Sequence, residues 1–229
     1  VMRNGVDLEK FYPMERQTIR STLKLDGFTL ISVGHLIERK GHHLIIEALK
    51  EMPDTKLMIA GDGPLESQLR ALASECKVSD RVIFLGAVPQ EKLPAYYSSA
   101  DCMVLASSRE GWANVLLEAM ACGTPVVATA IWGTPEVVVS DDAGLLIDDR
   151  TPQAIREGVQ RLMKAPPDRA DTRRYAEKFS WDETSGALNK LFHSINSSII
   201  RNTLAISIAH SPARSMCSFC VPFAVLSSI

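Results

Sequence analysis

Residues 107–129 read SSREGWANVLLEAMACGTPVVAT, and this stretch decides the fold. A polar, glycine-containing turn leads into an apolar helix predicted over 114–121, and a short apolar strand follows it. Residues 102–106 before it are also short and apolar, so they predict a core strand whose carboxyl end opens into the turn. Ligands of open α/β sheets bind at this edge. The stretch therefore predicts a ligand site around two carboxylates, Glu110 and Glu118.

The rest of the chain repeats this alternation of short apolar runs and longer helical patterns. Strands are predicted over residues 28–34, 56–61, 81–86, 102–106, 125–129 and 144–147. Helices are predicted over residues 42–51, 65–76, 93–99, 114–121, 152–163, 171–178 and 181–195. Most strands lack polar alternation, as expected when helices cover both faces of a parallel sheet. The order predicts right-handed crossovers and an α/β fold with a doubly wound parallel sheet.

The two ends of the chain differ from its middle. Residues 1–25 carry an Asn-Gly turn and a proline ahead of any strand, which is typical of an interdomain linker that leads into a domain. Residues 26–196 form the predicted doubly wound domain. Residues 197–229 are rich in serine and show no clear period, so they predict a poorly specified tail. We expect the chain to start within a longer protein.

Composition argues against several classes of protein. With 229 residues and 46% hydrophobic content, the chain can bury a sizeable core. A net charge of −2 leaves no broad basic field, so nucleic acid is not expected as a partner. Five scattered cysteines fit reduced thiols in the cytoplasm better than a disulfide framework. No apolar run of about 18 residues and no signal-peptide pattern occurs, so neither a membrane span nor export is expected.

The sequence predicts no metal site and no cofactor. Cys217 and Cys220 have metal-like spacing, but zinc needs two more ligands, and His210 is the nearest candidate. The paired aspartates at 141–142 and 148–149 lie next to turn signals, which favours solvated loop carboxylates.

The carboxylates of residues 107–129 are expected to reach different parts of one extended ligand. If the helix begins near Ala113, Glu118 lies ~7.5 Å along its axis, whereas Glu110 stays in the loop. A glycosidase pair would flank one bond at about 5–9.5 Å, which this spacing neither excludes nor favours. Free N–H groups at the helix start form an anion site, so a phosphate or diphosphate is expected between the carboxylates. The carboxylates would then bind hydroxyls on either side of the phosphate, which suggests a nucleotide sugar.

Two further loops close strands at the same edge. If the first strand lies near the strand that ends at Ala106, Arg39 or Lys40 in the first loop could neutralise the same diphosphate through a charge-assisted contact of about 1.5–3 kcal/mol. In the second, Gly61 and Gly63 permit either a ligand contact or an ordinary turn, and the pattern leaves both open. The first loop lacks the three-glycine fingerprint of dinucleotide sites, which disfavours an NAD enzyme.

Simpler interpretations exist for each of these residues. Glu118 lies in the apolar run VLLEAMA, where burial of an idle carboxylate would be costly, so a ligand role is favoured over an exposed position. Glu110 alone could merely complement the helix dipole, an effect of about 0.3–1 kcal/mol. His42 and His43 are predicted as helix-start surface and packing residues, and Trp112 as either a pocket wall or a loop anchor.

Together these motifs resemble a known family. Those that carry the resemblance are NGVD at 4–7, VGHLIERKG, GDGP, FLGAVP, and Glu110 and Glu118 with AMACGTPVVA. The chain resembles the C-terminal, nucleotide-binding half of a family 4 (group 1) retaining glycosyltransferase of GT-B type. The likeness covers residues 1 to about 196, with the motifs in order and correctly spaced over most of that length. It implies a Rossmann-like C-terminal half of a GT-B fold.

The resemblance also implies roles for individual residues. Glu110 and Lys40 would be the catalytic residues: Glu110 would contact hydroxyls of the donor sugar, and Lys40 would neutralise the diphosphate. Glu118 would bind the ribose. The other implied donor-binding residues are His35, Arg39, Gly61, Gly63, Ala87, Val88, Gly111, Trp112, Ala113, Asn114, Leu116 and Leu117. Of these, the segment after the third strand would meet the base, and backbone amides around the helix start would face sugar and phosphates. His35 stands where the family often has arginine, so diphosphate stabilisation could be weaker or could fall to Arg39.

The implied activity is transfer of a sugar from a nucleoside-diphosphate sugar to an acceptor with retained configuration, driven by diphosphate stabilisation. A sugar or lipid-linked acceptor would bind an N-terminal half that this chain lacks, so the chain alone is expected to be inactive in transfer. We expect a cytoplasmic protein, with peripheral contact at the inner membrane face if the acceptor is a lipid. A GT-B-type sugar-nucleotide epimerase and a non-catalytic Rossmann-like binding domain stay open as alternatives.

Overall fold

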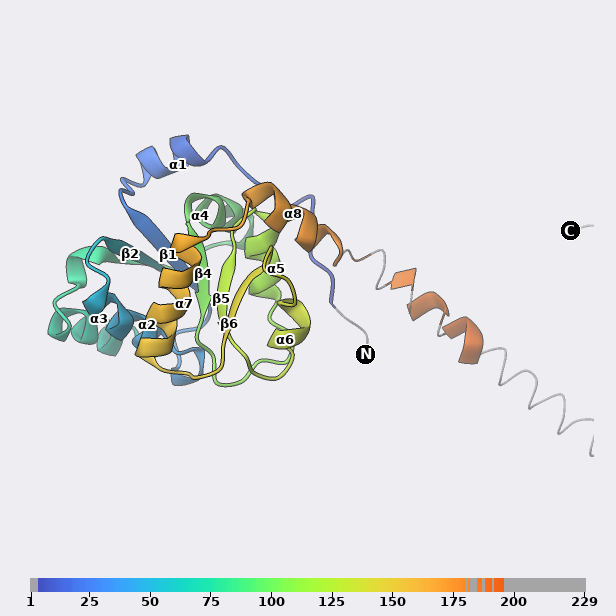
Figure 1. The fold of residues 1–229 in the computed structure, drawn as a ribbon. Coiled ribbons are helices and arrows are strands. Elements are labelled where there is room, and N and C mark those ends of the chain that lie inside the picture. The colour runs from blue at the N-terminus through green and yellow to red at the C-terminus, as the bar shows by residue number, and fades with distance from the viewer. Residues whose placement is uncertain (1–3, 180, 182–184, 187, 191, 196–229) are drawn as a thin grey trace, which may run out of the picture. The chain divides into compact units, whose positions relative to one another are not determined.

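The computed structural model describes residues 4–179, 181, 185–186, 188–190 and 192–195 (Figure 1). Contacts divide the chain into two units, Val1–Ala187 and Leu188–Ile229. The sheet and the candidate site lie within the first unit. The described residues between 181 and 195 are helical, as predicted. The predicted tail, 197–229, lies outside the described residues.

Six parallel strands form one sheet. They are β1 (Phe28–Val33), β2 (Thr55–Ala60), β3 (Val82–Gly86), β4 (Cys102–Leu105), β5 (Val126–Thr129) and β6 (Gly144–Ile147). Their order in the sheet is β3-β2-β1-β4-β5-β6. The chain moves outward from β1 in one direction and from β4 in the other, so the switch point lies where Leu30 pairs with Cys102. The predicted doubly wound parallel sheet is confirmed.

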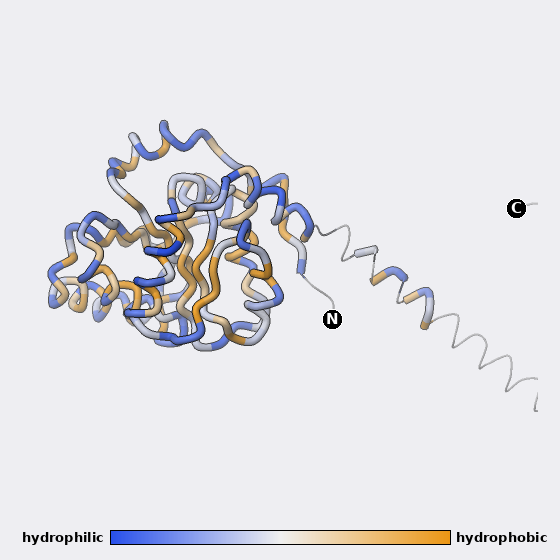
Figure 2. Tube along the Cα trace, viewed as in Figure 1, coloured by the Kyte–Doolittle hydropathy of each residue, from blue (hydrophilic) through white to orange (hydrophobic). Residues whose placement is uncertain are grey.

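Helices cover both faces of the sheet. They are α1 (Arg16–Thr22), α2 (His42–Ala48), α3 (Glu66–Glu75), α4 (Leu93–Ser99), α5 (Asn114–Ala121), α6 (Thr134–Val137), α7 (Pro152–Lys164) and α8 (Arg169–Glu177). Short 3₁₀ turns are found at Glu38–Lys40, Leu49–Glu51, Ser79–Arg81 and Gln90–Lys92. One core cluster joins the sheet to α4, α5 and α8, and the other joins it to α2, α3 and α7 (Figure 1). Figure 2 shows the hydrophobic residues concentrated along the strands between these layers.

The N-terminal segment, residues 4–25, packs onto the domain. Val6 and Phe11 are buried in the same core cluster as α5 and α8. The Val6 N–H donates to the Phe179 carbonyl over 2.8 Å, and the Arg173 guanidinium donates to the Ala121 carbonyl over 2.7 Å beneath this segment. The segment also contains α1, which the sequence analysis did not predict. Its proposed role as an interdomain linker stays a prediction.

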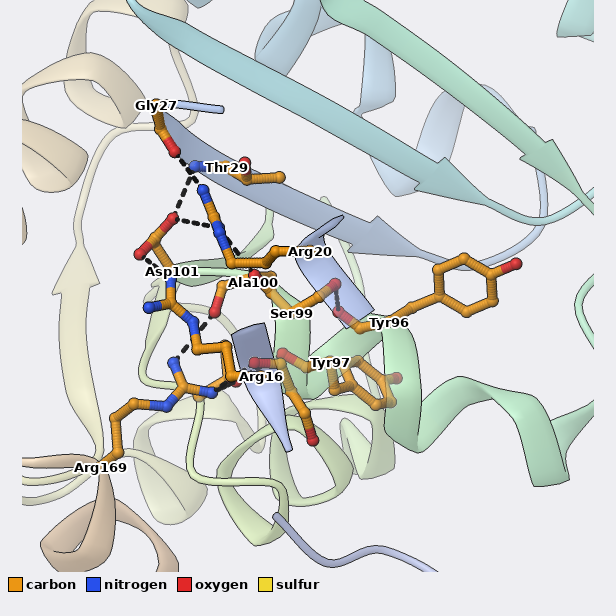
Figure 3. A network of polar contacts seen from close by, with 12 residues as sticks. Arg16, Arg20, Gly27, Thr29, Tyr96, Tyr97, Ser99, Ala100, Asp101 and Arg169 are labelled. Carbon is orange, nitrogen blue, oxygen red and sulfur yellow. Dashed lines mark hydrogen bonds and ion pairs between the residues drawn. The ribbon is translucent and has the colours of Figure 1, made fainter. Parts of the chain in front are cut away.

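An arginine network fixes α1 and α8 to the amino-terminal edge of the sheet (Figure 3). Asp101 precedes β4, pairs with Arg16 and Arg20 from α1, and accepts the Thr29 N–H at the start of β1 over 2.8 Å. Arg169 at the start of α8 donates to the Ala100 carbonyl over 3.0 Å. Burial lowers the pKa of Arg169 to about 10, which still leaves it protonated at neutral pH. This network lies at the opposite edge from the candidate ligand site.

His42 is a buried residue that should make stability depend on pH. It starts α2, its side chain is buried, and its Nδ1 lies 3.1 Å from the Ser32 hydroxyl. Burial lowers its pKa from 6.5 to about 4. Below pH 6.5 the unfolded chain therefore binds more protons than the folded one, so the stability present above pH 6.5 is lost as pH falls toward 4.

Because His42 binds a proton in the unfolded chain and not in the folded one, we expect it to lower the free energy of unfolding by about 2 kcal/mol from pH 7 to pH 5. Urea unfolding of the wild type and of His42→Gln at pH 5, 6 and 7 would measure it. In the glutamine variant the free energy of unfolding should fall by about 2 kcal/mol less over this pH slope, whatever its value at pH 7. An unchanged slope would contradict the assignment.

Candidate functional site

The loops after β1, β4 and β6 are joined at the carboxyl edge of the sheet. The Ser108 N–H, in the β4 loop, donates to the Arg39 carbonyl in the β1 loop over 2.9 Å. Arg150, after β6, donates to the Ala106 carbonyl over 2.8 Å and to the Glu38 carbonyl over 3.0 Å. Because two of these loops follow the adjacent strands of the switch point, their residues face a common ligand position.

Gly41 sets the distance between the β1 and β4 loops. Its φ is 72°, and a Cβ on it would lie 2.0 Å from the Ala106 carbonyl oxygen. Replacement by alanine should therefore lower the free energy of unfolding by about 2 kcal/mol, because the backbone must shift and adopt a left-handed conformation with a side chain. Urea unfolding would measure the loss. Gly111→Ala is the matched control, since no atom lies within 4 Å of its Cβ position, and an equal loss in both variants would contradict this account.

Lys40 and Glu110 meet at the switch point. The Lys40 ammonium lies 2.6 Å from Glu110 Oε1, and only 15% and 11% of the two side chains is exposed. The Ser107 hydroxyl donates to the same carboxylate oxygen over 2.7 Å. Ser107 is itself fixed by Thr129, whose hydroxyl donates to the Ser107 carbonyl over 2.8 Å. The two residues chosen from the sequence as the catalytic pair are thus in direct contact.

Glu118 lies one turn into α5 and is also buried. Its carboxylate accepts a hydrogen bond from the Tyr97 hydroxyl over 3.0 Å. Burial raises the pKa of Glu118, while hydrogen bonds from Tyr97 and Gln90 oppose that rise. The carboxylate lines a cavity of about 110 Å³. The residues around that cavity are Gly5, Val6, Asp7, Lys10, Phe11, Gln90, Asn114, Glu118 and Trp181.

The amino end of α5 carries no side-chain cap. Ala113 occupies the cap position, where no side chain hydrogen-bonds to the first turn, in contrast to Thr151 and Asp168, which cap α7 and α8. Asn114 follows, and its side-chain oxygen accepts a hydrogen bond from Asn4 over 3.3 Å. At this helix start the Asn114 and Leu116 N–H groups donate to the Trp112 and Ala113 carbonyls, each over 3.0 Å. The positive end of the helix dipole still favours an anion at this position.

The glycines of the second loop approach the protein backbone closely. A Cβ on Gly61 would lie 2.0 Å from the Gly34 carbonyl oxygen, and one on Gly63 would lie 2.7 Å from the Leu36 nitrogen. The Leu36 N–H donates to the Asp62 carbonyl over 2.7 Å. These contacts account for both glycines as spacers between the β1 and β2 loops. Their contact with a donor stays a prediction.

The remaining predicted residues fall into exposed and buried groups. His35 is exposed, with Nδ1 3.5 Å from an Asp62 carboxylate oxygen, and Arg39 is exposed beside Lys40. The other exposed or half-buried ones are Ala87, Val88, Gly111, Trp112 and Asn114. The side chains of Ala113, Leu116 and Leu117 are buried, so these residues could offer a ligand only their backbone groups. Their contact with a ligand stays a prediction.

Several residues of the site were not predicted from the sequence. Ser107 and Tyr97 hold the two glutamates, and Arg150 joins two loops. Ser107 precedes Glu110 in the polar turn and could have been picked out as a neighbouring donor. Tyr97 and Arg150 are 21 and 44 residues from their partners, and no local pattern indicates such pairs.

The described residues offer neither a membrane-spanning helix nor a cluster suited to a metal ion. None of the described helices has the length and apolar character that crossing a bilayer requires. Nor do the described residues contain a group of three histidine, cysteine, aspartate or glutamate side chains suited to a metal ion.

Comparison with known proteins gives a family match. The model of the family described as "Glycosyl transferases group 1" matches residues 14–179. A D-inositol 3-phosphate glycosyltransferase of Corynebacterium urealyticum is 33% identical over 216 residues, covering 85% of this chain and 51% of that protein. A GDP-mannose-dependent alpha-(1-6)-phosphatidylinositol monomannoside mannosyltransferase of Mycolicibacterium smegmatis is 36% identical over 176 residues, covering 71% and 46%. The chain spans about half the length of these relatives.

Solved structures share the fold. Sucrose-phosphate synthase from Thermosynechococcus elongatus superposes with a TM-score of 0.77 at 29% identity, covering 86% of this chain and 52% of that one. The C-terminal domain of a group 1 glycosyl transferase, LpcC of Francisella tularensis, has a TM-score of 0.64 at 28% identity and is 93% covered, against 75% of this chain. HepE of Anabaena, solved with UDP and glucose, has a TM-score of 0.77 at 22% identity, with 85% and 56% covered, and so supports the fold alone.

Proposed function

Because this chain belongs to the group 1 glycosyltransferases, we propose that it is the donor-binding half of such an enzyme. Its ligand would be a nucleoside-diphosphate sugar, held at the carboxyl ends of β1 and β4. Transfer of the sugar to an acceptor would require the N-terminal half of a longer protein. The name of one related protein supports the donor class, since that protein is GDP-mannose-dependent.

The observation that carries the proposal is the buried contact between Lys40 and Glu110 at the switch point. A lysine ammonium has three N–H donors, and one of them serves Glu110. Within the described part of the chain the Lys40 ammonium has no other hydrogen-bond partner, so its other two N–H groups could meet phosphate oxygens. Each such charge-assisted bond is worth about 1.5–3 kcal/mol, so Lys40 can account for much of the affinity for a diphosphate.

The order of strands arranges the rest of the donor. The base would lie by Ala87 and Val88 after β3, and the ribose hydroxyls would meet Glu118. The diphosphate would lie between Lys40 and the uncapped start of α5, which supplies backbone N–H groups. The transferred sugar would then lie against Glu110, whose carboxylate could accept hydrogen bonds from the sugar hydroxyls.

This arrangement suits departure of the diphosphate. When the bond between the anomeric carbon and the phosphate oxygen breaks, that oxygen gains negative charge. Lys40 and the start of α5 lie where they would stabilise this charge, which lowers the barrier. The acceptor hydroxyl oxygen would form the new bond to the anomeric carbon on the same face of the sugar and pass its proton to the departing phosphate oxygen, so configuration would be retained.

We also propose a cytoplasmic location. Among the described residues Cys76, Cys102 and Cys122 are free thiols, which suits a reducing compartment. Burial raises the pKa of Cys102 and Cys122, so both are unreactive as thiolates near neutral pH.

Calorimetry of this chain with UDP, GDP and ADP tests the proposal. At least one diphosphate should bind, and more tightly than the matching nucleoside. Added EDTA or Mg²⁺ should leave its affinity unchanged if, as expected, no metal takes part. Absence of binding to all three would favour a non-catalytic domain and contradict the proposal. Interconversion of free nucleotide sugars without an acceptor would instead identify an epimerase.

A further inference from the structure

Trp132, in the loop after β5, has an unusual conformation and high exposure. Its φ is 46°, a left-handed value that bulky side chains rarely adopt. The side chain does not gain burial in return, because 66% of the residue is exposed. Backbone conformations of this kind persist where the surroundings enforce them, and they gather at functional sites.

The surroundings of Trp132 tie it to the Glu110 loop. The next residue, Gly133, packs so closely that a Cβ on it would lie 2.3 Å from the Gly111 carbonyl oxygen. On the ring itself, the Arg109 guanidinium carbon lies 4.8 Å from the centroid of the indole. Among the described residues Arg109 forms no ion pair, so its N–H donors stay available. We refer to Trp132 and Arg109 together as the indole platform.

The sheet places the indole platform beyond the sugar end of the proposed donor. Since β5 is the neighbour of β4 on the side away from β1, the β5 loop lies farther from β3 than the Glu110 loop does. The base would lie by β3 and the diphosphate between β1 and β4. Glu110 turns inward to Lys40, whereas its exposed neighbour Arg109 stacks on Trp132.

We propose that the indole platform binds a polyhydroxylated six-membered ring of the acceptor. The C–H face of such a ring would stack on the open indole surface, and the Arg109 guanidinium would donate to its hydroxyls. The inference rests on the proposed function and deepens it, because it assigns to this half of the enzyme part of the acceptor site. The acceptor would therefore be a sugar or a cyclitol at the point of attack.

Spectra of the tryptophan indole N–H groups test this on the chain saturated with the nucleoside diphosphate that binds best. The probes are methyl α-mannopyranoside, methyl α-glucopyranoside and myo-inositol. At least one should cause a saturable shift of the Trp132 signal and leave the signal of Trp181, which is 48% exposed, in place. No saturable shift with any probe, or an equal shift of both signals, would overturn the proposal. A Trp132 shift with a nucleotide sugar but with none of the free rings would assign the ring to the donor and also overturn it.

Variants separate binding from folding. Because these variants lack the Trp132 indole, the response is read from the Arg109 side-chain N–H signal, which the rings should shift in the wild type. Trp132→Gly should lose that shift, while its Tm stays unchanged or rises, because glycine adopts a φ of 46° without strain. Trp132→Leu keeps an apolar side chain without the aromatic face and should lose the shift too. Phe192→Leu, which removes an aromatic ring that is 55% exposed and does not line the Glu118 cavity, is the control and should keep it. Calorimetry on the same samples measures diphosphate binding separately. If the wild type does not bind the diphosphate, the proposed function is contradicted. If it binds the diphosphate but shows no response to the rings, only the proposed role of the indole platform is contradicted.

Discussion

Replacing Lys40 with methionine should lower the affinity for nucleoside diphosphates about 100-fold, since two charge-assisted bonds to phosphate are lost. Methionine keeps the apolar stem, which in the wild type packs against Gly34. A Cβ on that glycine would lie 3.4 Å from the Lys40 Cδ and Cε atoms. The loss should therefore reflect charge and not packing. Calorimetry of both proteins with the diphosphate and with the matching nucleoside measures it, and the nucleoside should lose little affinity.

Arg39→Met is the matched control for this prediction. Arg39 is the adjacent cation, and it is exposed where Lys40 is largely buried. Its removal should weaken diphosphate binding by only about twofold, as for a solvent-screened charge. A larger loss in Arg39→Met than in Lys40→Met would show that Arg39 takes over from the arginine that His35 replaces. Unchanged binding in Lys40→Met would remove the basis of the proposed diphosphate site.

Glu118→Gln should weaken nucleoside diphosphate binding about 30-fold, because the ribose hydroxyls lose a charged acceptor. The same change should make the free protein more stable. Burial holds the folded-state pKa of Glu118 above 4.5, so the folded protein binds more protons than the unfolded chain. Its contribution to stability therefore falls as pH rises from 4.5 through the raised pKa. Glutamine does not titrate and still accepts the Tyr97 hydrogen bond, so its stability advantage should grow over that range.

Opposite effects on binding and on stability are the signature of a buried ligand-binding carboxylate. Urea unfolding at pH 4, 5, 6 and 7, together with calorimetry at pH 7, would measure both. Glu75→Gln on α3 is the control, since Glu75 is an exposed helical glutamate and should change neither quantity. A Glu118→Gln variant that is less stable but binds normally would indicate a structural residue, held by Tyr97 for packing alone.

Much of the fold followed from local pattern. The runs that became β4 and β5 are short and largely apolar, as burial on both faces of the sheet demands, and the α5 run is apolar apart from Asn114 and Glu118. The bounds of α4 and α5 match those predicted. The helix α1 was missed because its sequence, RQTIRST, has no apolar stripe. Arg16 and Arg20 hold it in place through Asp101, which lies 85 and 81 residues away. α6 was missed because four residues are too few to show a helical period.

The sequence likewise predicted part of the candidate site and missed the rest. Lys40 and Glu110 each follow a strand, and the sequence could bring them together only on the condition that these two strands are neighbours. The pairing of β1 with β4 meets that condition. The burial of Glu118 also followed from its apolar surroundings. Its partner Tyr97 and the Arg109 contact with Trp132 depend on how helices and loops pack, so sequence spacing contains no signal for them.

The central claim is that a nucleoside diphosphate binds between Lys40 and the start of α5. Backbone amide spectra of this chain, recorded during titration with the diphosphate that binds best, test it directly. The account predicts the largest shifts in residues 34–41 and 111–118, and little change around Thr29 and Asp101 at the opposite edge of the sheet. Shifts centred on that opposite edge, with residues 34–41 and 111–118 unmoved, would contradict it.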